Sequence, residues 1–145
     1  MTMLNETLQN FCNVLAARDA VPGGGGASAL AGALGAALGI MVGNLTVGKK
    51  KYADVEAPVR SLMTQAEPIR NRLLSLVDED AAAFEPLSRA YGIPKDAPGR
   101  AETMERCLCA AAAVPLEILE QCCRAVELME GFAAMGSAIA IYDAG

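Results

Sequence analysis

The sequence contains no histidine and no tryptophan, and aromatic residues make up only 4% of it. Without histidine, the chain lacks the commonest general base and the commonest metal ligand, and a Ser-His-Asp triad is excluded. The scarcity of aromatic rings argues against a protein that stacks nucleic-acid bases. Any catalysis must therefore depend on carboxylates, lysines, tyrosines, thiols, hydroxyls or backbone groups.

An excess of positive charge is also missing, because 12 basic residues stand against 17 acidic ones and the net charge is −5. Such a chain has no basic field to attract phosphates, which argues against broad nucleic-acid binding. The five cysteines form no CxxC pair, so they predict neither a disulfide framework nor a zinc site. We interpret them as small core residues in a reducing compartment, and expect a cytoplasmic protein because no charged segment precedes an early apolar block.

The residues that are present favour one helical domain. A chain of 145 residues with 53% hydrophobic content can bury a core of its own. Apolar residues recur at helical spacing, and no segment alternates as a half-buried strand does. The predicted fold class is all-α, an up-and-down-like helical bundle with a central Gly/Ala-rich buried helix. The predicted helices span residues 3–18, 27–47, 54–90 and 101–129, followed by a last segment from about 132.

Prolines and glycines predict where these helices bend or end. Pro68 and Pro86 are expected to kink or divide the third helix, and Pro115 to kink the fourth. Residues 91–99 form the clearest loop in the chain. Gly48 suits the position just after a helix, where a left-handed backbone conformation favours glycine.

The stretch VPGGGGASALAGALGAALGIMVGNLTVGKKK, residues 21–51, is the most unusual in the chain. Its helical part is uncharged and approaches the length of a membrane span. Because alanine and glycine dominate it, we favour the fully buried central helix of a soluble bundle over a membrane helix. Gly35, Gly39 and Gly43 recur at every fourth position and predict close approach of another backbone, most simply that of a second copy.

One carboxylate is out of place in an otherwise ordinary amphipathic helix. At 100° per residue, Asp80 falls in the middle of an apolar face, whereas Asp78 projects to the opposite side and Glu79 to a flank. A buried carboxylate must find a cation, collect hydrogen bonds or change its pKa. The spacing leaves two roles open for Asp80. It predicts either a general acid or base, or a structural partner of a cation or of a helix N-terminus such as the glycine turn.

Five segments occur in an order that resembles a known family. They are PGGGGASALAGALGAALGIMVGNLTVGKK at 22–50, DEDAAAF at 78–84, IPK at 93–95, AAAVPLEI at 111–118 and GSAIAIYDAG at 136–145. This combination resembles the cyclodeaminase/cyclohydrolase family, which includes formiminotetrahydrofolate cyclodeaminase and methenyltetrahydrofolate cyclohydrolase. The resemblance implies an all-helical domain that dimerises and acts, without a metal, on the carbon held by N5 and N10 of a tetrahydrofolate derivative, its substrate.

The resemblance also implies which residues form the site. The implied catalytic residues are Asp80 and Asp143. The implied substrate-binding residues are Gly23, Gly24, Gly25, Ser28, Asn44, Lys49 and Lys50, with the lysines suited to folate carboxylates. Two departures accompany it: Gly26 stands where the family usually has serine, and family members continue into further helices. The expected domain is therefore residues 1–145, lacking the last helices of the family.

The function predicted is conversion of 5-formiminotetrahydrofolate to 5,10-methenyltetrahydrofolate and ammonia by carboxylate acid/base catalysis. Methenyltetrahydrofolate cyclohydrolase is the first alternative, because both reactions need the same groups. A non-catalytic, truncated helical dimerisation module is the alternative of another class. The expected partners are a folate and a second copy held through the glycine-rich helix, with no nucleic acid and no membrane.

Overall fold

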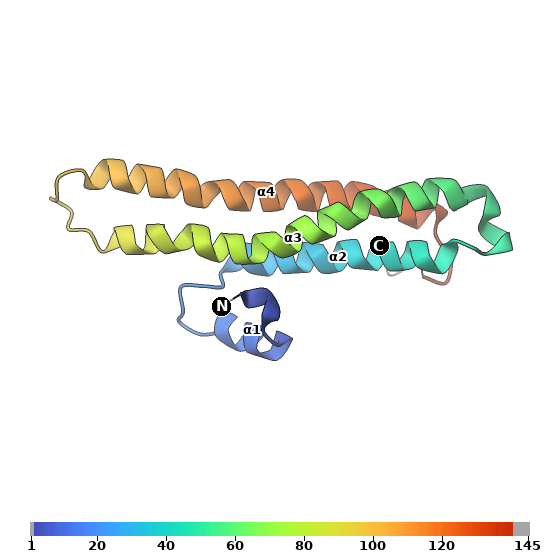
Figure 1. The fold of residues 1–145 in the computed structure, drawn as a ribbon, viewed down its shortest axis with the longest axis horizontal. Helices are drawn as coiled ribbons and strands as arrows, with labels where there is room; N and C mark the ends of the chain where they lie inside the picture. The colour runs from blue at the N-terminus through green and yellow to red at the C-terminus, as the bar shows by residue number, and fades with distance from the viewer. Residues whose placement is uncertain (1, 141–145) are drawn as a thin grey trace. The chain divides into compact units, whose positions relative to one another are not determined.

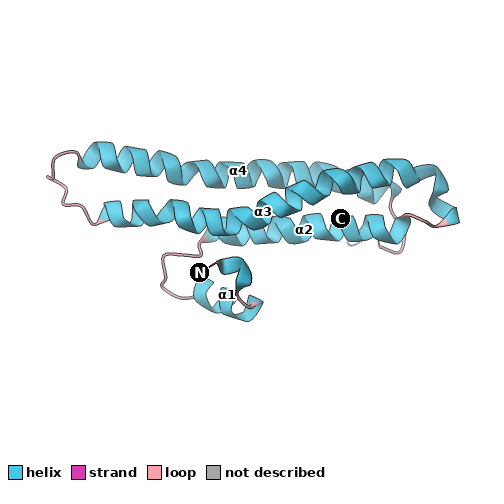
Figure 2. Ribbon diagram, viewed as in Figure 1, coloured by secondary structure: helices cyan, strands magenta, loops and turns pink. Residues whose placement is uncertain are grey.

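The computed structural model describes residues 2–140, and within them every regular element is helical (Figures 1 and 2). The absence of strands from this part of the chain confirms the predicted all-α fold class. In chain order the elements are the 3₁₀ helix η1 (Met3–Asn5), α1 (Leu8–Leu15), α2 (Gly24–Thr46), the 3₁₀ helix η2 (Lys50–Val55), α3 (Glu56–Tyr91) and α4 (Arg100–Met135).

Several predicted helix limits are wrong for local reasons. The first helix begins only at Leu8, because the Thr7 hydroxyl oxygen accepts a hydrogen bond from the Asn10 N–H at 3.1 Å and caps it there. The helix α3 runs without a break from Glu56 to Tyr91, so neither Pro68 nor Pro86 divides it, which was one of the two outcomes expected of them. The helix α4 likewise includes the predicted last segment as far as Met135. Long helices therefore accommodate prolines that sequence rules treat as breaks.

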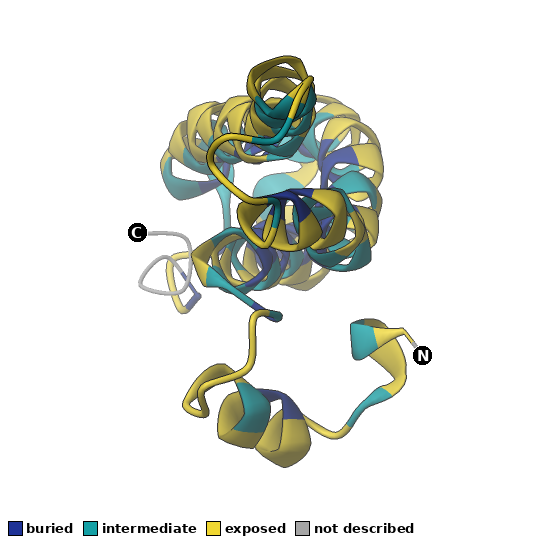
Figure 3. Ribbon diagram, turned by 90° about the vertical axis from the view of Figure 1, so that its left-hand side faces the viewer, coloured by how far each residue is buried: buried dark blue, intermediate teal, exposed yellow. Residues whose placement is uncertain are grey.

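The chain forms two compact units, each built from segments distant in sequence. One comprises residues 1–30 and 74–119, and the other residues 31–73 and 120–145. The second unit has a continuous hydrophobic core from α2, α3, α4 and the segment after α4. Its buried members are Ile40, Val42, Val59, Ala66, Phe132 and Ala140. Along the helices, buried residues are separated by intermediate and exposed ones (dark blue, teal and yellow in Figure 3).

Within a single chain, α2 is buried along one face only, so the predicted full burial of this helix stays a prediction that a second copy would have to complete. Leu34, Leu38, Met41 and Leu45 are 37–56% exposed, so only one face of the helix is covered. By length and composition α2 is apolar enough to cross a membrane, with a mean hydropathy of 1.7, although core helices of soluble proteins pass the same test. The buried face is rich in alanine and glycine, and the outward face holds the larger side chains.

The cysteines are also not the core residues that were expected. All five are free thiols; Cys12, Cys109 and Cys123 are exposed, and Cys107 and Cys122 are half-buried. Partial burial raises the pKa of the Cys122 thiol, and neighbouring Cys123 adds to this shift. Cysteine is a small apolar residue, but its type alone did not determine whether it is buried. The cysteines lie on α1 and α4, and parts of both helices face solvent.

The glycines of α2 meet side chains of their own chain, not another backbone as predicted. A Cβ on Gly39 would lie 2.7 Å from the Met129 sulfur and 3.0 Å from the Phe132 ring. A Cβ on Gly43 would lie 2.5 Å from Cγ of Met63. Gly35, in contrast, faces open space. The close approach therefore serves packing within the second unit.

A buried hydroxyl fastens the end of α2 to the segment after α4. The Thr46 hydroxyl donates to the Val42 carbonyl at 2.7 Å and accepts from the Ser137 N–H at 2.8 Å. The Ala138 N–H donates to the Tyr52 hydroxyl oxygen at 3.2 Å. Hydrogen bonds from the Ser137 side chain and from this N–H lower the pKa of Tyr52. The helix ends at Thr46, and Gly48, two residues further on, has a φ of +76°, which confirms the predicted glycine just after the helix.

We expect Gly39→Leu to lower the free energy of unfolding by about 2 kcal/mol, because the larger side chain must displace Met129 and Phe132. Gly35→Ala is the matched control, expected to be about 0.5–1 kcal/mol more stable because alanine favours the helix and nothing obstructs it. Urea denaturation followed by circular dichroism measures both. Equal stability of Gly39→Leu and the wild type contradicts this account of the packing.

Candidate functional site

The N-terminal end of α2 presents backbone donors that the helix itself does not use. The peptide bond between Val21 and Pro22 is cis, and the run of glycines follows at once. The first helical hydrogen bond joins the Ala27 N–H to the Gly23 carbonyl at 3.1 Å. The N–H groups of residues 24–26 therefore have no acceptor within the helix. Such a helix end attracts anions and carbonyl oxygens.

Asp80, on α3, occupies this helix end. Its Oδ2 accepts a hydrogen bond from the Gly26 N–H at 2.9 Å. The carboxylate lies over Gly25 so closely that a Cβ there would be 2.6 Å from Oδ2. Only glycine fits at position 25 while the carboxylate stays in place. Of the two roles left open by the sequence, the structure provides the helix-capping one.

The capping bond leaves half of the carboxylate available. Asp80 is half-buried, and its Oδ1 has no hydrogen-bond partner within residues 2–140. The N–H groups of Gly24 and Gly25 likewise have no acceptor among the described residues. One free carboxylate oxygen therefore lies beside two free donors. This arrangement can exchange a proton at one atom while it holds a carbonyl or carboxylate oxygen at another.

A cavity of about 250 Å³ opens beside this group. It is formed by the loop before α2, the start of α2, α3 and α4. Its lining residues are Ala20, Val21, Gly23, Gly24, Gly25, Asp80, Phe84, Ala111 and Pro115. The structure thus brings the predicted Asp80 together with the three predicted glycines. Sequence analysis missed Phe84, Ala111 and Pro115 as site residues, although Phe84 lies one turn from Asp80 and the other two lie in the AAAVPLEI segment.

The other predicted site residues do not line this cavity. Ser28 and Asn44 are exposed on α2, and Lys49 and Lys50 are exposed beyond its C-terminal end, in the second unit. Their roles in substrate binding stay predictions. Asp143 lies outside the described residues, so its catalytic role also stays a prediction.

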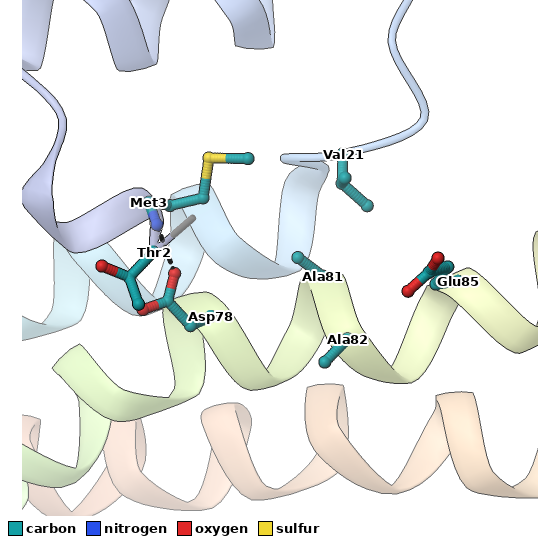
Figure 4. A pocket seen from close by; sticks show the side chains of 7 residues that line it. All are labelled: Thr2, Met3, Val21, Asp78, Ala81, Ala82 and Glu85. Carbon is teal, nitrogen blue, oxygen red and sulfur yellow. Dashed lines mark hydrogen bonds between the residues drawn. The ribbon is translucent and has the colours of Figure 1, made fainter.

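A larger cavity of about 380 Å³ lies against the other side of the DED sequence (Figure 4). Asp78 and Glu85 of α3 line it, together with Val21 and the N-terminal segment. The Met3 N–H donates to Asp78 Oδ1 at 2.5 Å. Asp78 was predicted to be a surface or flanking acid, but it is half-buried and fixes the N-terminal segment. Because no described residue at the start of an α-helix lines this larger cavity, the smaller one is the stronger candidate.

Comparison with known proteins identifies the family. The family model described as formiminotransferase-cyclodeaminase matches residues 7–145. A methenyltetrahydrofolate cyclohydrolase of Methylorubrum extorquens is 41% identical over 145 residues, covering 97% of this chain and 70% of the relative. A formimidoyltransferase-cyclodeaminase of Sus scrofa is 37% identical over 123 residues, covering 82% of this chain but only 23% of that protein.

A solved structure agrees with the sequence comparisons. The crystal structure of formiminotetrahydrofolate cyclodeaminase from Thermotoga maritima superposes with a TM-score of 0.84 at 31% identity. The match covers 97% of this chain and 68% of the solved one. With a family model matched over nearly its whole length and relatives above 30% identity, the chain belongs to the cyclodeaminase/cyclohydrolase family of folate one-carbon metabolism, as the resemblance predicted.

Proposed function

We propose that this protein converts 5-formiminotetrahydrofolate to 5,10-methenyltetrahydrofolate and ammonia, with Asp80 as the group that transfers the proton. The observation that supports this most is the free Oδ1 of Asp80 beside the cavity, held in place through Oδ2 by the Gly26 N–H. The reaction needs a positioned proton acceptor that becomes a donor, and a carboxylate serves as both. The name of the structurally similar Thermotoga maritima protein agrees with this reaction.

The steps balance with a single carboxylate. The N10 nitrogen attacks the carbon of the formimino group, whose nitrogen is protonated. A C–N10 bond forms, the π electrons of the C=N bond move to the formimino nitrogen, and the N10 proton passes to Asp80. Asp80 then returns that proton to the former imino nitrogen. The bond from carbon to this nitrogen breaks, ammonia leaves with the electron pair, and the methenyl bridge remains as a cation. The N–H groups of Gly24 and Gly25 suit a carbonyl or carboxylate oxygen of the substrate.

The second candidate is hydrolysis of the methenyl bridge, which is favoured by the 41% identity to the Methylorubrum extorquens cyclohydrolase. Here water adds to the methenyl carbon and one of its protons passes by way of Asp80 to N5. The C–N5 bond breaks and a formyl group remains on N10, while the second water proton is released. The same carboxylate serves both reactions, so activity measurements must separate them.

Spectrophotometry of the conjugated methenyl bridge distinguishes the two reactions. We expect absorbance to appear when the protein is mixed with 5-formiminotetrahydrofolate, together with one equivalent of ammonia. Loss of absorbance from added 5,10-methenyltetrahydrofolate, faster than in buffer, supports the hydrolase instead. No turnover of either folate, with no binding by calorimetry, overturns both proposals and favours the non-catalytic helical module.

Asp80→Asn separates capping from catalysis. An asparagine oxygen still accepts from the Gly26 N–H, so stability should fall by about 1 kcal/mol or less, but the amide exchanges no proton. We therefore expect kcat to fall about 10²–10⁴-fold. Asp78→Asn, at the carboxylate two positions earlier on α3, is the matched control and should keep its turnover. If Asp80→Asn keeps full turnover while its melting temperature falls, Asp80 is structural only.

We further propose that a second copy covers the exposed face of α2. Leu34, Leu38, Met41 and Leu45 recur at spacings of four, three and four residues, as apolar positions do along a two-helix seam. The helix has no charged residue along its 23 residues to oppose this contact. Two equivalent faces make a self-complementary interface about a two-fold axis.

Leu38→Glu tests this interface, because two buried carboxylates would meet across the axis without a cation. We expect the mass measured by light scattering after size exclusion to fall from dimer to monomer. Leu108→Glu on α4 is the control, since Leu108 is similarly exposed, 45% against 42%, and lies off the proposed face. A dimeric Leu38→Glu protein, or a monomeric wild type, refutes the proposal.

A further inference from the structure

A proline in the middle of α4 removes a donor from the helix at the candidate site. The helix runs from Arg100 to Met135 without interruption, and Pro115 lies inside it. In a regular helix the N–H of residue 115 would donate to the carbonyl oxygen of residue 111. Proline has no N–H, and its ring crowds that carbonyl. The Ala111 carbonyl is therefore denied its usual helical partner.

The two residues between which this helical hydrogen bond is missing both line the candidate cavity. Ala111 and Pro115, one turn apart on α4, both line it, together with Asp80 and the start of α2. The missing bond would run along the helix between these two residues. Ala111 is half-buried and Pro115 is exposed, so water reaches this wall, and a ligand donor can replace that water at the carbonyl oxygen.

Among residues 2–140, the cavity lining supplies no side-chain donor for this carbonyl. Its lining side chains are those of alanine, valine, phenylalanine, proline and the carboxylate of Asp80, and glycine adds none. The backbone donors of Gly24 and Gly25 belong to the start of α2, a different wall of the same cavity. Apart from water, a donor for the Ala111 carbonyl can therefore come from a bound molecule.

We propose that the Ala111 carbonyl oxygen, freed by Pro115, accepts a hydrogen bond from an N–H group of the folate substrate. The inference rests on the proposed function and adds a specificity-determining acceptor to it. The cavity then matches a ligand with an N–H donor on the α4 side and an oxygen acceptor on the α2 side. Two sources have this chemistry: the formimino nitrogen and the N–H groups of the pterin ring.

Pro115→Ala and Pro115→Val test the assignment, because each restores the N–H that would occupy the Ala111 carbonyl from within the helix. We expect both variants to gain about 5 °C in melting temperature, since the helix regains a bond and loses the clash. We expect KM, or the dissociation constant where no turnover occurs, to rise about three- to tenfold. Pro68→Ala in α3 is the matched control, with a comparable gain in stability and no change in KM, because Pro68 does not line the cavity.

Two folates distinguish the sources of the donor. Both 5-formiminotetrahydrofolate and 5,10-methenyltetrahydrofolate contain the pterin N–H groups, but only the former has a formimino N–H. Weaker binding of both supports the pterin donor, and weaker binding of the formimino compound alone supports the formimino donor.

Unchanged binding of both folates to the two Pro115 variants overturns the inference. Weaker folate binding by Pro115→Ala but not by Pro115→Val also overturns the inference. Valine keeps most of the apolar contact of proline, so this result would mean that the proline ring, not the Ala111 carbonyl, contributes to binding. A wild type that neither binds nor turns over either folate overturns the proposed function itself. The first kind of failure is seen in the wild type itself, whereas failure of the inference is seen only in the Pro115 variants, so the two can be told apart.

Discussion

The hydrogen bond from the Gly26 N–H to Asp80 is the interaction on which the candidate site depends. It places a carboxylate of α3 against the N-terminal end of α2, where the helix dipole and free N–H groups stabilise negative charge. Two conditions must hold for it to form. Residue 25 must be glycine, because any Cβ would collide with the carboxylate, and Asp80 must lie on the face of α3 that meets α2. One oxygen satisfies the helix end, and the other stays available for chemistry.

The glycines of α2 have different physical roles along one helix. At its start, Gly25 makes room for a carboxylate, whereas Gly39 and Gly43 make room for Met129, Phe132 and Met63. On the opposite face the helix presents leucines to solvent. A segment without a single charge thus combines a polar site at one end, dense packing along one side and an apolar surface along the other. Its low polarity reflects these three uses and does not require a membrane.

A site without histidine can still perform acid/base chemistry if the few polar groups that it has are rigidly positioned. Among the described residues, Asp80 is the one titratable side chain that lines the candidate cavity, and backbone groups supply the remaining polarity. Backbone donors and acceptors need no side-chain ordering, so they are preorganised by the helices themselves. Glycine exposes such donors at the start of α2, and proline leaves a carbonyl without its donor within α4. Beside the Asp80 carboxylate, the two residue types that most disfavour helices therefore determine which backbone donors and acceptors stay available at this cavity.

The sequence by itself determined the helical class and the family, and it offered the glycine turn as a partner for Asp80. Helical periodicity, the glycine run and the DEDAAAF segment depend only on local order, and local order sets which face a residue occupies. It also predicted Gly48 as the glycine just after α2, since a left-handed conformation is a local requirement.

Only the tertiary structure decided what those faces meet. The sequence did not show that Gly39 faces a thioether, that the leucines of α2 stay exposed, or that Pro115 of α4 joins Asp80 at one cavity. These contacts join residues that are tens of positions apart in the sequence. Helical periodicity predicts which residues share a face, but not which other element packs against that face. The cysteines and Asp78 were misjudged for the same reason, since residue type predicts burial only on average.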